Sequence, residues 1–291
     1  MKHSSVLIVG CGDIGIRTGA LLVAQGWDVA GVRRNISKLP AEFVAHAADY
    51  TQTASLDFIA QLEPDFVLAT FNPADRTQAG YKAGFQTAMS HLISGLGMHR
   101  PRHILMVSST RVFAEAHGGW VDNNSALTDD DPYALAIIAA EQYLLASGHN
   151  ASLVRFAGIY GAPGSRFLSR VRSGELCHSE PVSYTNRIHR DDCAGFLAHL
   201  LQLVDAGKTI EPLYIGVDDE PAPRYEVEAW LAGALRLAGV QQQRLLGPVD
   251  RPSGRGQSGH KRCRNRALHD SGYQLIYPSY KSGYGAMLAQ S

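Results

Sequence analysis

A glycine-rich loop near the N-terminus constrains the fold of this chain more than any other feature. The loop reads Gly10-Cys11-Gly12-Asp13-Ile14-Gly15, a GxGxxG pattern. It directly follows an apolar run, residues 5–9, that predicts a buried strand, and it opens a helix predicted over residues 13–25. In this context the first glycine permits a tight turn, the second lets the backbone approach a pyrophosphate, and the third lets helix and strand pack closely.

The loop therefore predicts a dinucleotide site, because the N-terminus of the helix offers free N–H groups and a partial positive charge to phosphates. The alternative is a glycine turn that binds nothing. The residues predicted to bind the cofactor here are Gly10, Gly12, Asp13, Ile14 and Gly15.

The first half of the chain alternates short apolar runs with amphipathic stretches. Strands are expected over residues 28–32, 42–47, 65–71, 103–108 and 151–156, and helices over 55–62, 78–96 and 132–146. Such alternation predicts an α/β fold with a Rossmann-type, doubly wound parallel sheet. We expect residues 1–157 to form this domain and residues 186–216 to complete it, with a helix over 192–204 and a strand over 213–217.

A smaller C-terminal α/β lobe is expected from residues 158–185 and 217–291. Its sequence is rich in turns, apart from a helix predicted over residues 224–238. Residues 247–259 are rich in Gly, Pro and Ser, which predicts a loop. The tail contains Tyr273, Tyr277, Tyr280 and Tyr284 and is also expected to form turns.

The type of dinucleotide is predicted from the end of the second strand. NAD enzymes usually have an acidic residue there, whereas this chain has Arg33 and Arg34. Guanidinium groups suit a 2′-phosphate, so NADP(H) is the predicted cofactor, with NAD as the other candidate and solvated surface arginines as the alternative. Asp49 is expected either to cap the adenine edge or to form a simple turn. Thr70 and Ser108, each at the end of a predicted strand, are also predicted to bind the cofactor.

The overall composition excludes several classes of partner. Lys plus Arg equals Asp plus Glu, so no basic excess indicates nucleic acid or a membrane surface. The first apolar run is too short for a signal peptide, so a cytoplasmic location is expected. The four cysteines and twelve histidines lack metal-ligand spacing, so no metal site is predicted. Each cysteine is expected to be a small core or loop residue, with access to solvent as an alternative for Cys11.

Four further segments resemble a known family. Ser108-Ser109-Thr110-Arg111-Val112-Phe113 is similar to SSxxVYG, with Phe113 in place of the tyrosine. Asp131-Pro132-Tyr133 with Glu141 resembles PYxxSK…E, residues 155–161 resemble R-x-x-x-x-YGPG, and residues 187–192 resemble R-x-x-H-V-D-D. In this order the segments resemble the extended short-chain dehydrogenases, the NAD-dependent epimerase/dehydratase family. The GxGxxG loop, in place of the family's usual GxxGxxG, and Ile137, in place of its lysine, resemble the atypical subgroup. The tail, with residues 259–263, Ser271-Gly272-Tyr273 and Tyr277-Pro278, is similar to that of the bacterial YeeZ-like proteins.

The resemblance implies roles for individual residues. Ser109, with Thr110 as an alternative, would bind the substrate oxygen, and Tyr133 would transfer the proton and contact the cofactor. Arg111, Arg187 and His189 are candidate substrate-binding residues. A small-molecule substrate, such as a sugar or nucleotide sugar, and a homodimer are also implied.

One departure from the family pattern affects the chemistry. Ile137 stands where the family has the lysine that assists the tyrosine, so Arg111 or His189 would have to supply a positive charge. Two functions therefore remain open: an oxidoreductase or epimerase-like enzyme, and a non-catalytic NADP(H) sensor or scaffold.

Two other segments have local sequence signals of their own. The basic run over residues 260–266 is expected to be a solvated loop, with a diphosphate contact as the alternative. Asp192 is expected to cap the helix that follows it.

Overall fold

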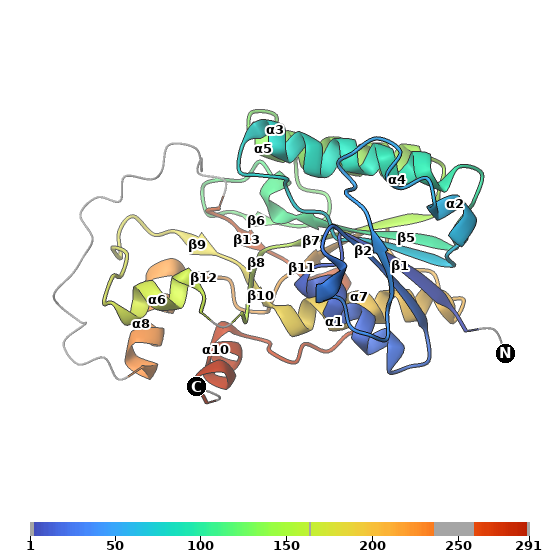
Figure 1. The fold of residues 1–291 in the computed structure, drawn as a ribbon. Helices are drawn as coiled ribbons and strands as arrows, with labels where there is room; N and C mark the ends of the chain where they lie inside the picture. The colour runs from blue at the N-terminus through green and yellow to red at the C-terminus, as the bar shows by residue number, and fades with distance from the viewer. Residues whose placement is uncertain (1–2, 163, 236–258, 290–291) are drawn as a thin grey trace.

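A seven-stranded parallel sheet forms the centre of the molecule (Figure 1). We describe a computed structural model, covering residues 3–162, 164–235 and 259–289 of the 291-residue chain. The strands are β1 (Ser5–Val9), β2 (Asp28–Arg33), β3 (Val44–Ala47), β4 (Phe66–Ala69), β5 (His103–Ser109), β7 (Ala151–Phe156) and β11 (Leu213–Gly216). Their order is β11-β7-β5-β4-β1-β2-β3, so the direction of winding reverses between β1 and β4. The predicted fold class is confirmed, and ligands of such sheets bind at this reversal.

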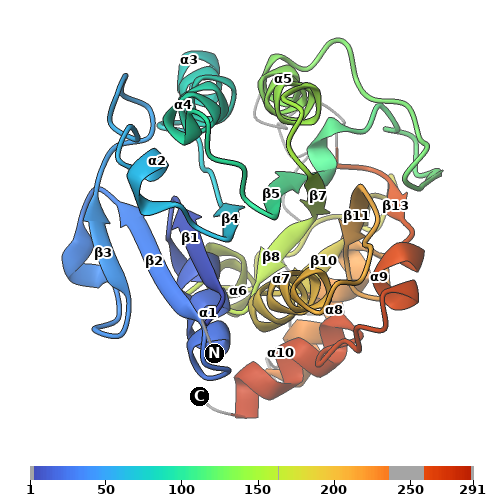
Figure 2. The same ribbon diagram turned by 90° about the vertical axis from the view of Figure 1, so that its right-hand side faces the viewer.

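Helices cover both faces of the sheet (Figure 2). One face carries α1 (Asp13–Val23) and α7 (Arg190–Asp205), which pack against each other. The other carries α5 (Pro132–Ala146) and a continuous helical stretch made of α3 (Gln78–Tyr81), the π-helical turn η2 (Lys82–Thr87) and α4 (Ala88–Leu96).

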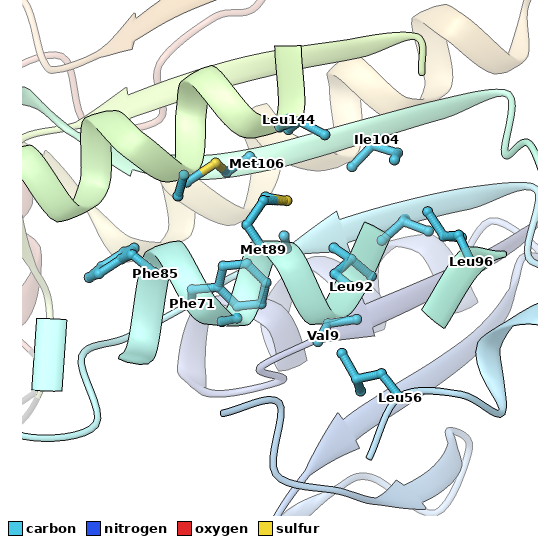
Figure 3. Close-up of a cluster of buried hydrophobic side chains, with 14 of the residues drawn as sticks. Val9, Leu56, Phe71, Phe85, Met89, Leu92, Leu96, Ile104, Met106 and Leu144 are labelled. Carbon is cyan, nitrogen blue, oxygen red and sulfur yellow. The ribbon is translucent and has the colours of Figure 1, made fainter. Parts of the chain in front are cut away.

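Buried side chains alternate between the two faces along the central strands β1, β4 and β5. Leu7 and Val9 of β1 belong to the cluster under α4 and α5, whereas Val6 and Ile8 belong to the cluster under α1 and α7. Figure 3 shows the first cluster, where Met89 and Leu92 of α4 lie near Val9. Burial of this kind on both faces explains the nearly continuous apolar runs of the sequence.

The C-terminal lobe has its own small core. It contains α6 (Arg166–Arg172), α8 (Arg224–Ala234) and α10 (Tyr280–Ala289). Two short sheets adjoin these helices, one pairing β8 (Gly158–Tyr160) with β10 (Arg187–His189) and the other β9 (Tyr184–Thr185) with β12 (Ala222–Pro223). A third pairs β6 (Trp120–Val121) with β13 (Arg262–Cys263), which is followed by α9 (Arg266–Asp270).

Several element predictions need correction. The helix predicted over residues 55–62 is reduced to α2 (Ile59–Leu62), because Ala54 adopts a left-handed φ of 61° and the Ser55 hydroxyl binds the Asp49 carbonyl. The tail, predicted as turns, contains α10. The predicted helix over 224–238 is described as α8 up to Ala234. The loop predicted over 247–259 lies, except for Gly259, outside the described residues.

Two further properties of the described residues bear on other kinds of function. None of the helices in this part of the chain combines the length and apolar composition that crossing a membrane requires. Within the same residues, no group of three or more His, Cys, Asp or Glu side chains is arranged to hold a metal ion.

Candidate functional site

The three glycines of the loop after β1 have three different environments. Gly10 has a φ of 82°, and a Cβ there would lie 2.7 Å from the Thr70 carbonyl oxygen. A Cβ at Gly15 would lie 2.9 Å from Ile8, so this glycine permits close packing of α1 on β1. A Cβ at Gly12 would meet only the Gly10 carbonyl, at 3.7 Å. Packing within the protein therefore accounts for Gly10 and Gly15, whereas Gly12 leaves open space above the loop.

Gly12 also begins α1. No side chain among the described residues caps this helix end. The first N–H groups of a helix have no intrahelical acceptor, so they remain available to an anion. Asp13, in the first turn, is exposed and pairs with Arg17 at 3.3 Å and Arg190 at 3.5 Å. Ile14 is half-buried against the core under α1.

A pocket of about 350 Å³ lies beside the glycine loop. Its lining includes residues of the loop and three cationic side chains, Arg33, Arg34 and Lys38. Arg33 ends β2, and the segment after it turns because the Asn35 side chain accepts from Ser37 N–H at 3.1 Å. Within the described part of the chain, none of the three cations has a carboxylate within ion-pair distance.

Asp49 and Thr70 both support this pocket. The Asp49 carboxylate accepts from Thr51 N–H at 3.0 Å, so it forms the turn that was one of its two predicted roles, and it also lines the pocket. The Thr70 hydroxyl donates to the Gly10 carbonyl at 2.9 Å and thereby holds the glycine loop. Tyr50, which the sequence did not single out, lines the pocket and donates to the Asn72 carbonyl at 3.2 Å.

Cys11, within the loop, is fully buried. It is a small core residue, as one of the sequence interpretations predicted, and the alternative of solvent access is wrong because its side chain belongs to the core under α1. Burial raises the pKa of the thiol to about 12, so the thiol stays protonated at neutral pH.

The predicted catalytic residues lie on a turn after β5 and on the first turn of α5. Ser109 ends β5, and its hydroxyl accepts from Arg111 N–H at 3.2 Å, which begins the turn η3 (Thr110–Val112). Tyr133 follows the cap of α5, where the Asp131 carboxylate accepts from Tyr133 N–H at 3.0 Å. The residues Asp131 and Pro132 explain why this helix begins where the sequence predicted.

Arg111 joins these two segments. Its guanidinium donates to both carboxylate oxygens of Asp131, at 2.6 and 3.1 Å, and lies 4.8 Å from the centre of the Tyr133 ring. Tyr81 packs edge-on against the same ring at 4.9 Å. A cation held over an aromatic ring stabilises the position of both groups. The structure thus brings Ser109, Arg111 and Tyr133 into one site.

Ile137 is 2% exposed and belongs to the core under α5. Its side chain can supply neither charge nor a hydrogen bond to Tyr133. Of the two residues predicted as substitutes for the family's lysine, Arg111 is the one that contacts Tyr133 in the structure.

His189 has a structural position. Its ring caps α7 by accepting from Asp191 N–H at 3.2 Å, and it packs against Tyr160 and Tyr277. The ring is 4% exposed, and burial lowers its pKa. Gly161, with a φ of 110°, is required beside it because a Cβ would lie 2.4 Å from the ring.

Arg187 is also buried, on β10. Its guanidinium lies 5.8 Å from the Tyr280 ring, and one of its terminal nitrogens has no hydrogen-bond partner among the described residues. Burial raises the pKa of nearby Asp218 to about 8, although Arg187 opposes this shift. The predicted substrate contact of Arg187 would therefore need a group that enters the lobe.

Ser108 takes part in a buried network rather than facing an open pocket. Its hydroxyl donates to Glu141 at 2.5 Å, and Arg155 donates to both oxygens of the same carboxylate, at 2.9 and 2.7 Å. This network joins β5, β7 and α5 under η3, the turn that follows Ser109 and is the predicted catalytic turn. The sequence identified Glu141 by its spacing from Tyr133, but not its partner.

The prediction for Asp192 is wrong. His189, not Asp192, caps α7, and Asp192 is fully buried. Its carboxylate accepts from the backbone N–H groups of Ile276 and Tyr277, at 2.6 and 3.0 Å, and so fastens the C-terminal tail to α7. Burial raises its pKa, while these hydrogen bonds oppose that shift.

Comparison with known proteins agrees with this geometry. A family model described as NAD(P)H-binding matches residues 10–203, about two thirds of the chain. Protein YeeZ of Escherichia coli is 25% identical over 281 residues, which cover 94% of this chain and 96% of that protein.

Solved structures show the same similarity. A candidate NAD-dependent epimerase/dehydratase from Methylobacillus flagellatus is 32% identical, with 99% of each chain covered and a TM-score of 0.80. The UDP-glucose 4-epimerase of Thermotoga maritima, solved with UDP-glucose, is 14% identical, covers 99% of this chain and 100% of its own, and has a TM-score of 0.75. At that identity the likeness concerns the fold alone.

Proposed function

Because this chain belongs to the NAD(P)H-binding Rossmann family of epimerase- and dehydratase-like proteins, we propose that it is an NADP(H)-dependent oxidoreductase or epimerase. Its substrate would carry a hydroxyl/ketone pair, and sugars and nucleotide sugars are the class to test first. The observation that supports the cofactor best is the pocket beside the glycine loop, with Arg33, Arg34 and Lys38 on its wall.

The preference for NADP(H) follows from the charges of that pocket. The two dinucleotides differ only in a 2′-phosphate, which is a dianion at neutral pH. Three cations without carboxylate partners among the described residues favour that anion, and a guanidinium can bind it through two hydrogen bonds. Gly12 and the uncapped end of α1 would hold the pyrophosphate.

The bound dinucleotide would supply hydride transfer, and the chain's own residues would position the substrate. The Ser109 hydroxyl would bind the reacting oxygen, with Thr110 adjacent on the same turn. The Tyr133 hydroxyl would hold and move the proton. Arg111 would fix the Tyr133 ring by its stacking contact, and Asp131 would fix Arg111.

The cofactor is tested by titrating NADPH and NADH into the wild type and into the double variant Arg33→Ala/Arg34→Ala. Loss of charge-assisted hydrogen bonds should weaken NADPH binding by at least about tenfold and leave NADH binding nearly unchanged. Lys208→Ala, which removes an exposed cation far from the pocket in sequence, is the control. Equal effects on both dinucleotides would contradict NADP(H) specificity.

The second candidate function is a non-catalytic NADP(H) sensor or scaffold. Burial of Ile137 in the core favours it, because the cation of the usual catalytic pair is missing from α5. A panel of aldehydes and ketones, followed by NADPH absorbance, and of nucleotide sugars, followed by formation of the epimer, separates the two. The second readout is needed because an epimerase returns the hydride to its product and leaves the NADPH absorbance unchanged. Turnover that is lost in Tyr133→Phe supports the enzyme, whereas NADPH binding without turnover across the panel supports the sensor.

A homodimer is part of the same proposal. The helix α5 is apolar on all sides, and its outer side presents Leu135 and Tyr143, which are 41% and 45% exposed. A helix that is apolar all round is usually covered, and a second copy of this helix would match it. Sedimentation of the wild type as a dimer and of Leu135→Lys as a monomer would support this; a monomeric wild type would contradict it.

A further inference from the structure

The basic run after residue 259 lies between the strand β6 and Asn186, the residue that precedes β10. Its strand β13 pairs with β6, which belongs to the long connection after the catalytic turn (Figure 1). On its other side, Asn186 donates to the Lys261 carbonyl at 3.0 Å and accepts from Cys263 N–H at 2.8 Å. The expectation of a solvated loop is therefore wrong for this part of the run.

Individual arginines of the run are used in packing. The Arg262 guanidinium donates to the Gly118 carbonyl at 2.8 Å and lies 5.0 Å from the Trp120 ring. Arg264 also lies 5.0 Å from that ring. These contacts favour a structural role for the two arginines over the predicted alternative of a diphosphate site.

Lys261 differs from its neighbours because its side chain enters the protein beneath the catalytic turn. It is 2% exposed, and its ammonium group donates to the Thr110 carbonyl at 3.1 Å and the Phe113 carbonyl at 2.9 Å. These two carbonyls lie at the start and just beyond the end of the turn η3, which follows Ser109.

Two buried cations lie near the Phe113 ring. The Lys261 ammonium lies 5.9 Å from its centre, and the Arg155 guanidinium lies 5.0 Å from it. Arg155 is neutralised by Glu141, whereas no carboxylate among the described residues lies within ion-pair distance of Lys261. A buried ammonium without an ion pair is costly, so its backbone acceptors must compensate for the lost water.

We propose that Lys261 is a positioning residue that fixes the backbone of the catalytic turn and so places Ser109, Thr110 and Arg111 toward Tyr133. For its effect on turnover, this inference depends on the proposed function. Its structural part, that one ammonium from the C-terminal segment holds the turn, does not depend on a bound cofactor.

The surroundings of Lys261 support this role. Burial lowers its pKa to about 8, while Glu115, Asp131 and Cys263 oppose that shift and Arg111 adds to it. Glu115 is itself bound to the backbone N–H groups of His117 and Gly119. The Lys261 ammonium therefore donates its hydrogen bonds to the two carbonyls of the turn.

Hydrogen–deuterium exchange of the full chain without cofactor tests the structural part. In Lys261→Met, amides of residues 110–114 should exchange at least about tenfold faster, since two charge-assisted hydrogen bonds are lost, while amides of α1 stay protected. Lys261→Arg should restore part of the protection. Arg266→Met, which removes a 90% exposed cation of the same run, should change neither region.

Turnover and coenzyme binding then test the functional part. In Lys261→Met, kcat should fall while the KM for NADPH, set at the far end of the site by Arg33 and Arg34, stays unchanged. Unchanged exchange at residues 110–114, or equal acceleration throughout the chain, would overturn the positioning role. If Lys261→Met does not fold, Lys261→Gln replaces it, and failure of both to fold would show a general structural role instead.

The two proposals fail separately. A wild type that binds neither dinucleotide would refute the proposed function, while the exchange experiment would still decide the role of Lys261.

Discussion

Replacing Lys261 with methionine should change how the stability of the protein depends on pH. Burial lowers the pKa of this lysine from 10.5 to about 8 in the folded protein. Between these two values the unfolded chain binds a proton that the folded chain has lost. The unfolding free energy therefore rises with pH across this window, by about 1.4 kcal/mol per pH unit for one group.

The whole effect is on the order of 3 kcal/mol, the size of the full pKa difference. Below pH 8 Lys261 is charged in both the folded and the unfolded wild type, so the unfolding free energies of the wild type and Lys261→Met should differ by a constant amount. Between pH 8 and 10.5 the wild type should gain stability relative to the variant. The gain arises because the buried amine no longer has to be charged.

Urea unfolding at a series of pH values measures this difference. Other titrating groups, such as the buried tyrosines, contribute equally to both proteins and cancel. Arg266→Met serves as the matched control, and its unfolding free energy should depend on pH in the same way as that of the wild type. If the unfolding free energies of Lys261→Met and the wild type change in parallel with pH, burial does not lower the pKa of Lys261. If the wild type instead loses stability relative to the variant as the pH rises, an ion pair raises the pKa of Lys261.

Four further outcomes follow from the site. Gly12→Ala should abolish NADPH binding in calorimetry while leaving thermal stability within about 1 kcal/mol, because a Cβ there meets little protein. Gly10→Ala should instead destabilise the fold by about 1–3 kcal/mol, owing to its positive φ and the nearby Thr70 carbonyl; equal stability of the two variants would contradict this assignment. Arg155→Met should cost about 3–5 kcal/mol in denaturant unfolding, since it leaves a buried carboxylate unpaired; a cost below 1 kcal/mol would argue against that pair. Arg111→Ala should lower kcat by at least about tenfold with NADPH affinity unchanged, as expected when a group positions the catalytic tyrosine; an unchanged kcat would remove Arg111 from the mechanism.

Local sequence signals predicted the elements that local interactions determine. The helix α5 has the predicted bounds because Asp131 caps it and Pro132 suits its first position. The strands β1 and β7 also match, since each is a short apolar run bounded by turn residues. The glycine loop lies between β1 and α1 as the pattern required.

Features that depend on contacts distant in sequence could not be predicted in the same way. Lys261 belongs to a charged run, which normally indicates a solvated surface, and only its placement beneath Thr110 buries it. Asp192 has the local signature of a cap, but its partners, Ile276 and Tyr277, come from the C-terminal tail.

Contacts distant in sequence also limited what could be predicted of the candidate catalytic site. The sequence identified Ile137 as a departure and left Arg111 and His189 as possible sources of charge. The structure distinguishes them, because Asp131 directs Arg111 to the Tyr133 ring while His189 caps α7.

The proposed function requires that the glycine loop and the pocket beside it, with Arg33, Arg34 and Lys38, bind NADP(H). Calorimetric titration of the wild type with NADPH and, separately, with NADH measures this binding. We expect saturable one-to-one binding of NADPH that is at least about tenfold tighter than that of NADH, the discrimination expected from one or two guanidinium–phosphate contacts. Absence of saturable heat with either dinucleotide would contradict the proposed function.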